Sequence, residues 1–209
     1  MKRLAIFLIY QFLLFNLPAQ PVDSVKIFQS KAPKVFKAVF ETSLGEFVIE
    51  TYRNWSPEGA DRFYQLVSSG FYDNVMIYRA TGQFVQFGIS NDTALNSFWE
   101  RYPLKDEKVK FNNTGGTVAF GSGGPNTRIS QIFINKIDNP HLDTLGNSKS
   151  FPPFGKIIAG MDVVNSFFSG YGDEIAYRHQ DSIYQKGNTY LIKKFPRLDS
   201  IIKAYIHKD

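Results

Sequence analysis

The chain has 209 residues, a formal net charge of +5 and no cysteine. Its basic residues are scattered rather than gathered in a stripe, so the charge argues against a nucleic-acid-binding protein. The length suits a single domain, and without disulfides its stability must come from a core that 20 phenylalanines and 11 tyrosines can build.

The first nineteen residues have the pattern of a secretory signal peptide. Lys2 and Arg3 precede a mostly apolar run that ends with the small residue Ala19. The alternative is a membrane anchor, but a spanning helix needs about 20 apolar residues. This run is shorter and is interrupted by Gln11 and Asn16. We expect cleavage after Ala19, export to the periplasm or cell envelope, and no stable membrane insertion of the mature protein.

Residues 20–35 lack hydrophobic periodicity and predict a tether, after which one domain is expected over residues 36–209. The domain opens with two alternating runs, residues 37–42 and 45–52, which predict a hairpin. The pair Ser56-Pro57 then predicts the start of a helix, with serine as the N-cap and proline at the first helical position.

Alternating runs predict six further strands, at residues 74–80, 84–90, 115–120, 129–135, 154–158 and 200–206. A second helix is expected over residues 161–168, and turn-forming residues predict an exposed loop over residues 136–153. About eight strands and two helices favour an all-β-dominated fold over a parallel α/β fold. The expected architecture is a closed eight-stranded antiparallel barrel capped by two helices.

A glycine-rich run stands directly before one of these strands. Gly121, Ser122 and Gly123 offer almost bare main chain, which another backbone could approach closely. Gln131 and Phe133 follow in the strand, two residues apart, so they point to the same face. Exposed main chain beside an apolar side chain predicts a peptide-docking surface. The run lacks the Lys-Ser or Lys-Thr ending of a phosphate-binding loop.

This loop resembles that of the cyclophilin family of peptidyl-prolyl cis/trans isomerases, which usually reads Ala-Asn-Ala-Gly-Pro-Asn-Thr. Ile77-Tyr-Arg79 is similar to the family's Phe-His-Arg-Val strand, and Phe154-Gly-Lys-Ile-Ile-Ala-Gly-Met-Asp-Val-Val164 is similar to a later family motif. The resemblance covers about residues 37–206. It implies a cyclophilin-like barrel, isomerase activity on proline-containing polypeptide segments, and no cofactor. We expect a monomer.

The resemblance places Arg79 at the catalytic position. Rotation about an X-Pro bond breaks amide resonance, and a guanidinium can hydrogen-bond the prolyl nitrogen as its lone pair emerges. The alternative is an ordinary exposed strand arginine. The resemblance also implies a set of substrate-binding residues: Phe84, Val85, Gln131, Phe133, Leu142, Gly121, Ser122, Gly123, Phe151 and His141.

The chain departs from the family pattern at several positions. The family has a second glutamine in this region. Counted from Arg79, its position is occupied by Phe87, and Gln86 lies one residue earlier. On a regular strand this count points Gln86 away from the site, although a bulge near Gln83 could return it, so Gln86 is a further candidate for substrate binding. His141 replaces a common tryptophan, which predicts weak cyclosporin binding.

Two other classes of function are also consistent with the sequence. A non-catalytic proline-peptide-binding module or chaperone could keep the groove and lose the rate enhancement. A carbohydrate-binding β protein is a further alternative, because exposed aromatic rings also stack on sugars. The three histidines have no acid or cysteine at ligand spacing, so we expect no metal site.

Overall fold

The computed structural model describes residues 27–144 and 151–208. The predicted signal peptide and residues 20–26 of the predicted tether lie outside the described residues. The later part of the expected tether lies against the domain. Phe28 packs with its ring centroid 5.6 Å from those of both Phe98 and Trp99, and Ala32 is buried. Aromatic packing therefore starts before the predicted domain boundary at residue 36.

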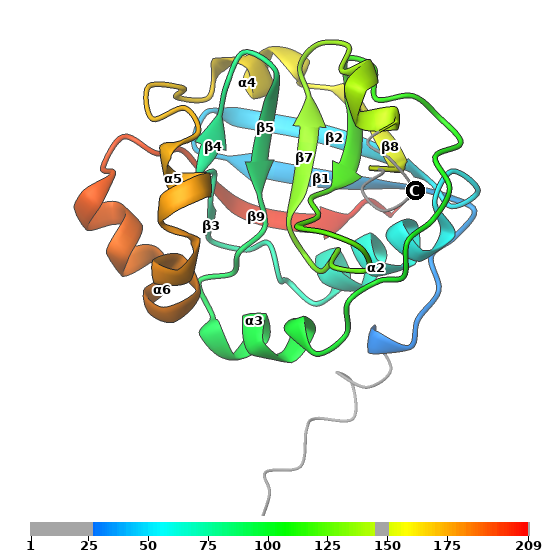
Figure 1. The fold of residues 1–209 in the computed structure, drawn as a ribbon, viewed down its shortest axis with the longest axis horizontal. Helices are drawn as coiled ribbons and strands as arrows, with labels where there is room; N and C mark the ends of the chain where they lie inside the picture. The colour runs from blue at the N-terminus through cyan, green and yellow to red at the C-terminus, as the bar shows by residue number, and fades with distance from the viewer. Residues whose placement is uncertain (1–26, 145–150, 209) are drawn as a thin grey trace, which may run out of the picture.

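One antiparallel sheet forms the body of the molecule (Figure 1). Its nine strands in the described residues are β1 (Val35–Thr42), β2 (Gly45–Tyr52), β3 (Val75–Met76), β4 (Arg79–Ala80), β5 (Phe84–Phe87), β6 (Thr117–Phe120), β7 (Ile132–Asn135), β8 (Pro153–Ala159) and β9 (Ser200–Ile206). They are ordered β3-β9-β1-β2-β8-β6-β7-β5-β4. Only two residues separate β3 from β4 at the opposite ends of this order, so the sheet is strongly curled, which is consistent with the expected closed barrel.

The β-dominated antiparallel fold is confirmed, with one strand more than predicted. The extra strand arises because the run predicted at residues 74–80 breaks into β3 and β4. β3 pairs with β9, whereas β4 pairs with β5. The short stretch between them carries the chain from one edge of the sheet to the other.

Helices cover the ends and one side of the barrel. They are α2 (Pro57–Ser68), α3 (Thr93–Glu100), α4 (Met161–Ser166), α5 (Glu174–Arg178), α6 (Gln180–Lys194) and the 3-10 helix η1 (Pro140–Asp143). The sequence predicted only α2 and α4. In the described part of the chain, none of these helices is long and apolar enough to span a membrane.

The sequence did not predict helix α6, because the apolar periodicity of this segment is weak and a glycine interrupts it. Gly187 has a φ of 57°, a left-handed conformation that other residues rarely adopt. A Cβ atom at this position would lie 2.7 Å from Oδ1 of Asn91, so glycine also permits a close approach to the loop before α3. The helix is therefore kinked at Gly187, where it meets the loop before α3.

The start of α2 is as predicted, but its cap comes from elsewhere in the chain. The hydroxyl of Ser56 makes no capping bond to the helix and instead donates to the carboxylate of Glu107. The same carboxylate accepts hydrogen bonds from the backbone N–H groups of Glu58 and Gly59. An acid at this end of a helix is favourable because the free N–H groups carry partial positive charge.

Two aromatic-rich clusters hold the elements together. The larger fills the barrel, where the buried rings of Phe40, Phe47, Phe63, Tyr72 and Phe87 pack against one another. The smaller cluster lies outside the barrel and joins α5 and α6 to the strand edge, through Met76, Tyr78, Ile89, Ile175, Ile183, Leu191 and Phe195. Figure 1 shows these two helices beside β3 and β4. The smaller cluster thus fixes a pair of helices next to Arg79.

Candidate active site

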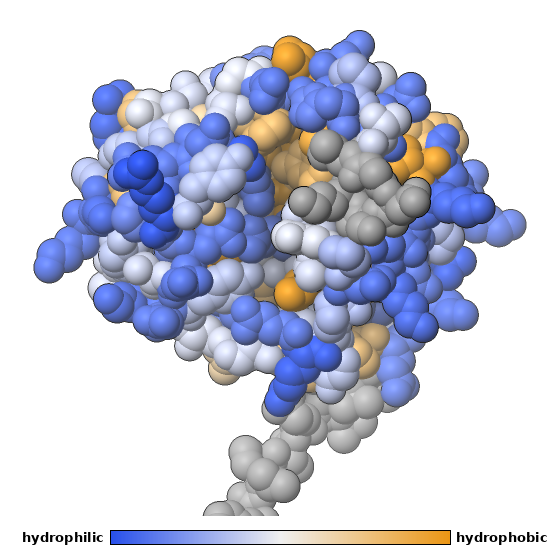
Figure 2. Space-filling model, in the orientation of Figure 1, coloured by the Kyte–Doolittle hydropathy of each residue, from blue (hydrophilic) through white to orange (hydrophobic). Residues whose placement is uncertain are grey.

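A cavity of about 580 Å³ opens on the face formed by β4, β5, η1 and α5. Figure 2 shows apolar surface exposed inside a hollow of this face. The cavity brings together almost all residues that the sequence singled out: Arg79, Phe84, Gln86, Gly121, Ser122, Gly123, Gln131, Phe133, His141, Leu142 and Phe151. Val85 differs from the expectation, because its side chain is fully buried in the core of the barrel.

The hairpin of β4 and β5 explains which of these side chains face the cavity. A tight turn, closed by the N–H of Thr81 donating to the carbonyl of Phe84 at 2.9 Å, pairs Arg79 directly with Gln86. Residues opposite each other on paired strands point to the same face. Gln86 therefore faces the cavity without a bulge, and Val85 and Phe87 face the core. The count from Arg79 predicted the wrong face for Gln86. It assumed that side chains alternate between faces without interruption, whereas a turn separates β4 from β5.

Three protein groups hold the guanidinium of Arg79. Its Nε donates to Oδ1 of Asp173 at 2.6 Å, its Nη1 to Oε1 of Gln86 at 2.8 Å, and its Nη2 to the hydroxyl of Tyr177 at 3.2 Å. The guanidinium carbon lies 4.3 Å from the ring centroid of Phe84. With 13% of its side chain exposed, Arg79 is fixed at the cavity wall rather than free in solvent.

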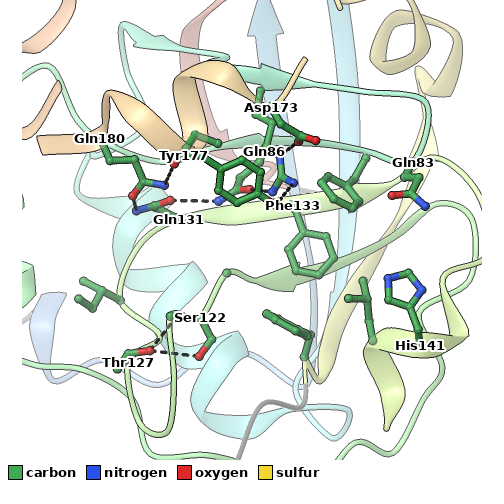
Figure 3. Close-up of a pocket in the computed structure, with 18 of the residues that line it drawn as sticks. Gln83, Gln86, Ser122, Thr127, Gln131, Phe133, His141, Asp173, Tyr177 and Gln180 are labelled. Atoms are coloured by element: carbon green, nitrogen blue, oxygen red, sulfur yellow. Dashed lines mark hydrogen bonds and ion pairs between the residues drawn. The ribbon is translucent and has the colours of Figure 1, made fainter. Parts of the chain in front are cut away.

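The side-chain amide of Gln131 is fully hydrogen-bonded inside the protein (Figure 3). Its Oε1 accepts from the hydroxyl of Tyr78 and from Nε2 of Gln86, while its Nε2 donates to Gln180 at 3.0 Å and to Tyr184 at 3.1 Å. Burial raises the pKa of Tyr78 well above its usual range and also raises the pKa of Tyr184. Both hydroxyls therefore keep their protons at neutral pH.

The other half of the cavity is apolar. Phe133 lies at its centre, with its ring centroid 5.9 Å from that of Phe84 and 5.6 Å from that of Phe151. Leu142, on η1, packs into the same cluster. Aromatic and aliphatic walls of this kind suit a small apolar ring such as that of proline.

The glycine loop borders the cavity and is held by its own polar side chains. The hydroxyl of Ser122 donates to the carbonyl of Gly124 at 2.6 Å, and the N–H of Gly123 donates to the hydroxyl of Thr127 at 2.9 Å. A Cβ atom at Gly121 would lie 3.3 Å from Nε2 of Gln86, so glycine keeps this part of the cavity open. These bonds hold the main chain of the loop at the rim of the cavity, where a peptide backbone can approach it.

The sequence missed the wall that α5 and α6 add to the cavity. Asp173, Tyr177, Gln180 and Tyr184 all line it, at spacings of four, three and four residues. Figure 3 shows Asp173, Tyr177 and Gln180 along the edge that also carries Gln86 and Gln131. That spacing is typical of one helix face and was a usable signal. Apolar periodicity does not reveal this face, because its residues carry polar groups.

Comparison with known proteins agrees with this geometry. A model of the family described as cyclophilin type peptidyl-prolyl cis-trans isomerase/CLD matches residues 37–185. The chain belongs to the cyclophilin-type peptidyl-prolyl cis-trans isomerase family. A peptidyl-prolyl cis-trans isomerase of Acinetobacter baylyi is 34% identical to it over 127 residues, which are 60% of this chain and 68% of the relative.

Two further cyclophilins extend the comparison. Peptidyl-prolyl cis-trans isomerase B of Escherichia coli is 30% identical over 147 residues, covering 68% of this chain and 89% of that protein. A crystal structure of a cyclophilin from Cryptosporidium parvum superposes with a TM-score of 0.61 at 21% identity, and covers 84% of this chain and 99% of that one. The structural match shows that the fold is that of a cyclophilin.

The cavity of this cyclophilin has the parts that bond rotation requires. A cation with N–H donors stands beside an apolar hollow, and main chain is exposed at the rim. The reaction needs no covalent step, so positioned donors and a ring pocket suffice in principle. Within the described residues, no cluster of three or more His, Cys, Asp or Glu side chains could hold a metal ion.

Replacing Phe133 with alanine should weaken binding of a proline-containing peptide by about ten- to a hundredfold, because a buried aromatic contact contributes about 1.5–3 kcal/mol. Titration followed by NMR measures the Kd. Phe111→Ala is the matched control, since Phe111 stacks on Trp55 and does not line the cavity. Equal affinity for the Phe133 variant and the wild type would show that the proline ring binds elsewhere.

Proposed function

We propose that this cyclophilin accelerates X-Pro bond rotation in exported or envelope proteins and so assists their folding. The observation that supports the catalytic part is the position of Arg79. Its guanidinium lies 4.3 Å from the ring of Phe84, at the wall of a cavity whose other half is apolar. A proline ring seated against Phe133 would bring its nitrogen close to a fixed cation.

The chemistry follows from the amide bond. Resonance gives the X-Pro bond a barrier of about 18–20 kcal/mol, so unaided rotation takes tens of seconds. As the bond twists, the lone pair returns to the prolyl nitrogen and becomes a hydrogen-bond acceptor. A donor aimed at that nitrogen binds the twisted form more tightly than either planar form, and this difference in binding is the catalysis.

Activity is tested by a protease-coupled or NMR exchange assay on a peptide with one X-Pro bond. We expect the purified protein to accelerate exchange between the cis and trans forms. The competing hypothesis is that the protein is a non-catalytic binding module. The same experiment distinguishes the two functions. Saturable binding of the peptide with no acceleration of exchange would select the binding module and reject the isomerase.

Export rests on the signal-like pattern of residues 1–19, with Lys2 and Arg3 before an apolar run. Expression of the full chain in a bacterial host should yield a periplasmic protein whose N-terminus is Gln20. N-terminal sequencing and intact mass measure the cleavage site. Ala19→Arg should block cleavage, because the site requires a small residue at that position. A full-length protein recovered from the cytoplasm would reject export.

A further inference from the structure

The guanidinium of Arg79 is held from two sides by different parts of the chain. On the sheet side, Oε1 of Gln86 accepts from Nη1. Nε2 of Gln86 in turn donates to Oε1 of Gln131 at 3.0 Å. On the helix side, Asp173 accepts from Nε and Tyr177 from Nη2. Gln180, on α6, bonds Gln131 and so joins the helix side to the sheet side. Hydrogen bonds from Arg79 through Gln86 and Gln131 thus lead back to the helices that also hold the cation.

The contact with Asp173 leaves part of the guanidinium for a substrate. A guanidinium carries five N–H groups in one plane, and three of them are engaged by Asp173, Gln86 and Tyr177. The two that remain belong to Nη1 and Nη2, because Nε has only one hydrogen and Asp173 accepts it. A carboxylate on Nε therefore fixes the plane of the guanidinium without occupying the hydrogens that remain.

Asp173 is well placed to act in this way. It stands at the N-cap of α5 but makes no side-chain capping bond to that helix. Helix α5 itself is anchored by Ile175, which is fully buried in the cluster that joins α5 and α6 to the strand edge. The carboxylate is therefore an acceptor carried by an anchored helix and is not used to cap that helix.

We propose that Asp173 is a positioning residue for Arg79, and that α5 and α6 form a wall that fixes the cation before substrate binds. This inference rests on the proposed isomerase function. The energetic reason is preorganisation: a donor already oriented toward the prolyl nitrogen needs no rearrangement as the bond twists. A carboxylate at 2.6 Å also partly neutralises the cation, an effect that acts in the opposite direction and would slow the reaction.

Two substitutions distinguish these effects. Asp173→Ala removes the acceptor, and we expect kcat to fall about tenfold while KM changes by less than about twofold, because the lost contact orients Arg79 and does not touch substrate. Asp173→Asn keeps an oxygen acceptor without the charge, and we expect it to recover most of kcat. NMR of the Arg79 Nε–H signal should show protection from solvent exchange in the wild type and the Asn variant, and loss of protection in the Ala variant.

Glu174→Ala is the matched control. Glu174 is the next residue, its side chain is 49% exposed like that of Asp173, and it faces His179 at 3.5 Å instead of the cavity. We expect its kcat to equal that of the wild type. An Asp173→Ala variant as fast as the wild type, or faster, would overturn the inference, as would an Asn variant as slow as the Ala variant.

Failure of the inference and failure of the proposed function give different results. If the wild type accelerates exchange and Asp173→Ala is equally active, only the positioning role is overturned. If the wild type does not accelerate exchange at all, the isomerase function is overturned, and the positioning role in catalysis with it. The Nε–H signal of Arg79 reports on the contact itself in either case.

Discussion

Arg79→Ala is expected to lower kcat/KM for a proline peptide by about 10²- to 10³-fold, the usual cost of removing one donor that stabilises a transition state. The guanidinium is the cationic donor of the cavity's polar edge, next to Gln86 and the ring of Phe84. Because it acts on the twisted bond more than on the planar one, most of the loss should appear in kcat. The exchange assay described above measures it.

The variant should fold, because the ion pair that it loses is partly exposed. Asp173 is about half exposed, so water can solvate its carboxylate when the cation is gone. Arg53→Ala is the matched control, since Arg53 forms an ion pair with Asp61 at 2.7 Å and lies outside the cavity. Arg79→Lys keeps the charge but lacks the planar fork, so it should recover only part of the rate. An Arg79→Ala variant with the rate of the wild type would reject the catalytic role.

Phe40→Ala is expected to destabilise the protein by about 3–5 kcal/mol, the usual cost of removing a buried aromatic ring. Phe40 is fully buried in β1, and its ring centroid lies 4.9 Å from that of Phe47 and 5.8 Å from those of Tyr72 and Phe87. The neighbours come from different strands and a loop, so they cannot all move in to fill the space. A domain of ordinary stability would lose a large part of its free energy of unfolding.

Unfolding in guanidinium chloride, followed by intrinsic fluorescence, measures this difference. The control is again Phe111→Ala, because Phe111 is 40% exposed and its ring stacks on Trp55 with a centroid separation of 4.1 Å. Its loss should cost about 0.5–1.5 kcal/mol, the usual contribution of an aromatic pair. Similar midpoints for the two variants would mean that the barrel core relaxes far more easily than its packing indicates.

The position of Gln131 changes how a bound peptide is expected to interact with this cyclophilin. The sequence resemblance implied that Gln131 contacts the substrate backbone, and the side chain does line the cavity. All four of its hydrogen-bonding positions are nonetheless taken by Tyr78, Gln86, Gln180 and Tyr184. A substrate that used Gln131 would have to displace one of them, so its role in binding stays a prediction.

Several features of the protein could be predicted from the sequence because they depend on neighbours along the chain. The opening hairpin follows from alternation in two adjacent runs, and both β1 and β2 match it closely. The glycine loop and the strand with Gln131 and Phe133 lie within one short segment. Their local pattern was therefore enough to predict that they line the same cavity. Arg79 and the aromatic residues reached the cavity as the family resemblance implied.

The remaining features could not be predicted from the sequence, because they depend on contacts between distant segments. Gln86 faces Arg79 since a tight turn sets the register of β4 and β5, and a count along the chain does not show where a turn resets the alternation. Asp173 contacts Arg79 although 94 positions separate them in the sequence. The contact forms because the smaller hydrophobic cluster packs α5 and α6 against the strand edge. Local alternation and motifs were enough to predict the family, the antiparallel β fold and the catalytic candidate. The partners that hold that arginine depend on packing between distant segments, because the spacing of Asp173 and Tyr177 marks a helix face and does not show what this face contacts.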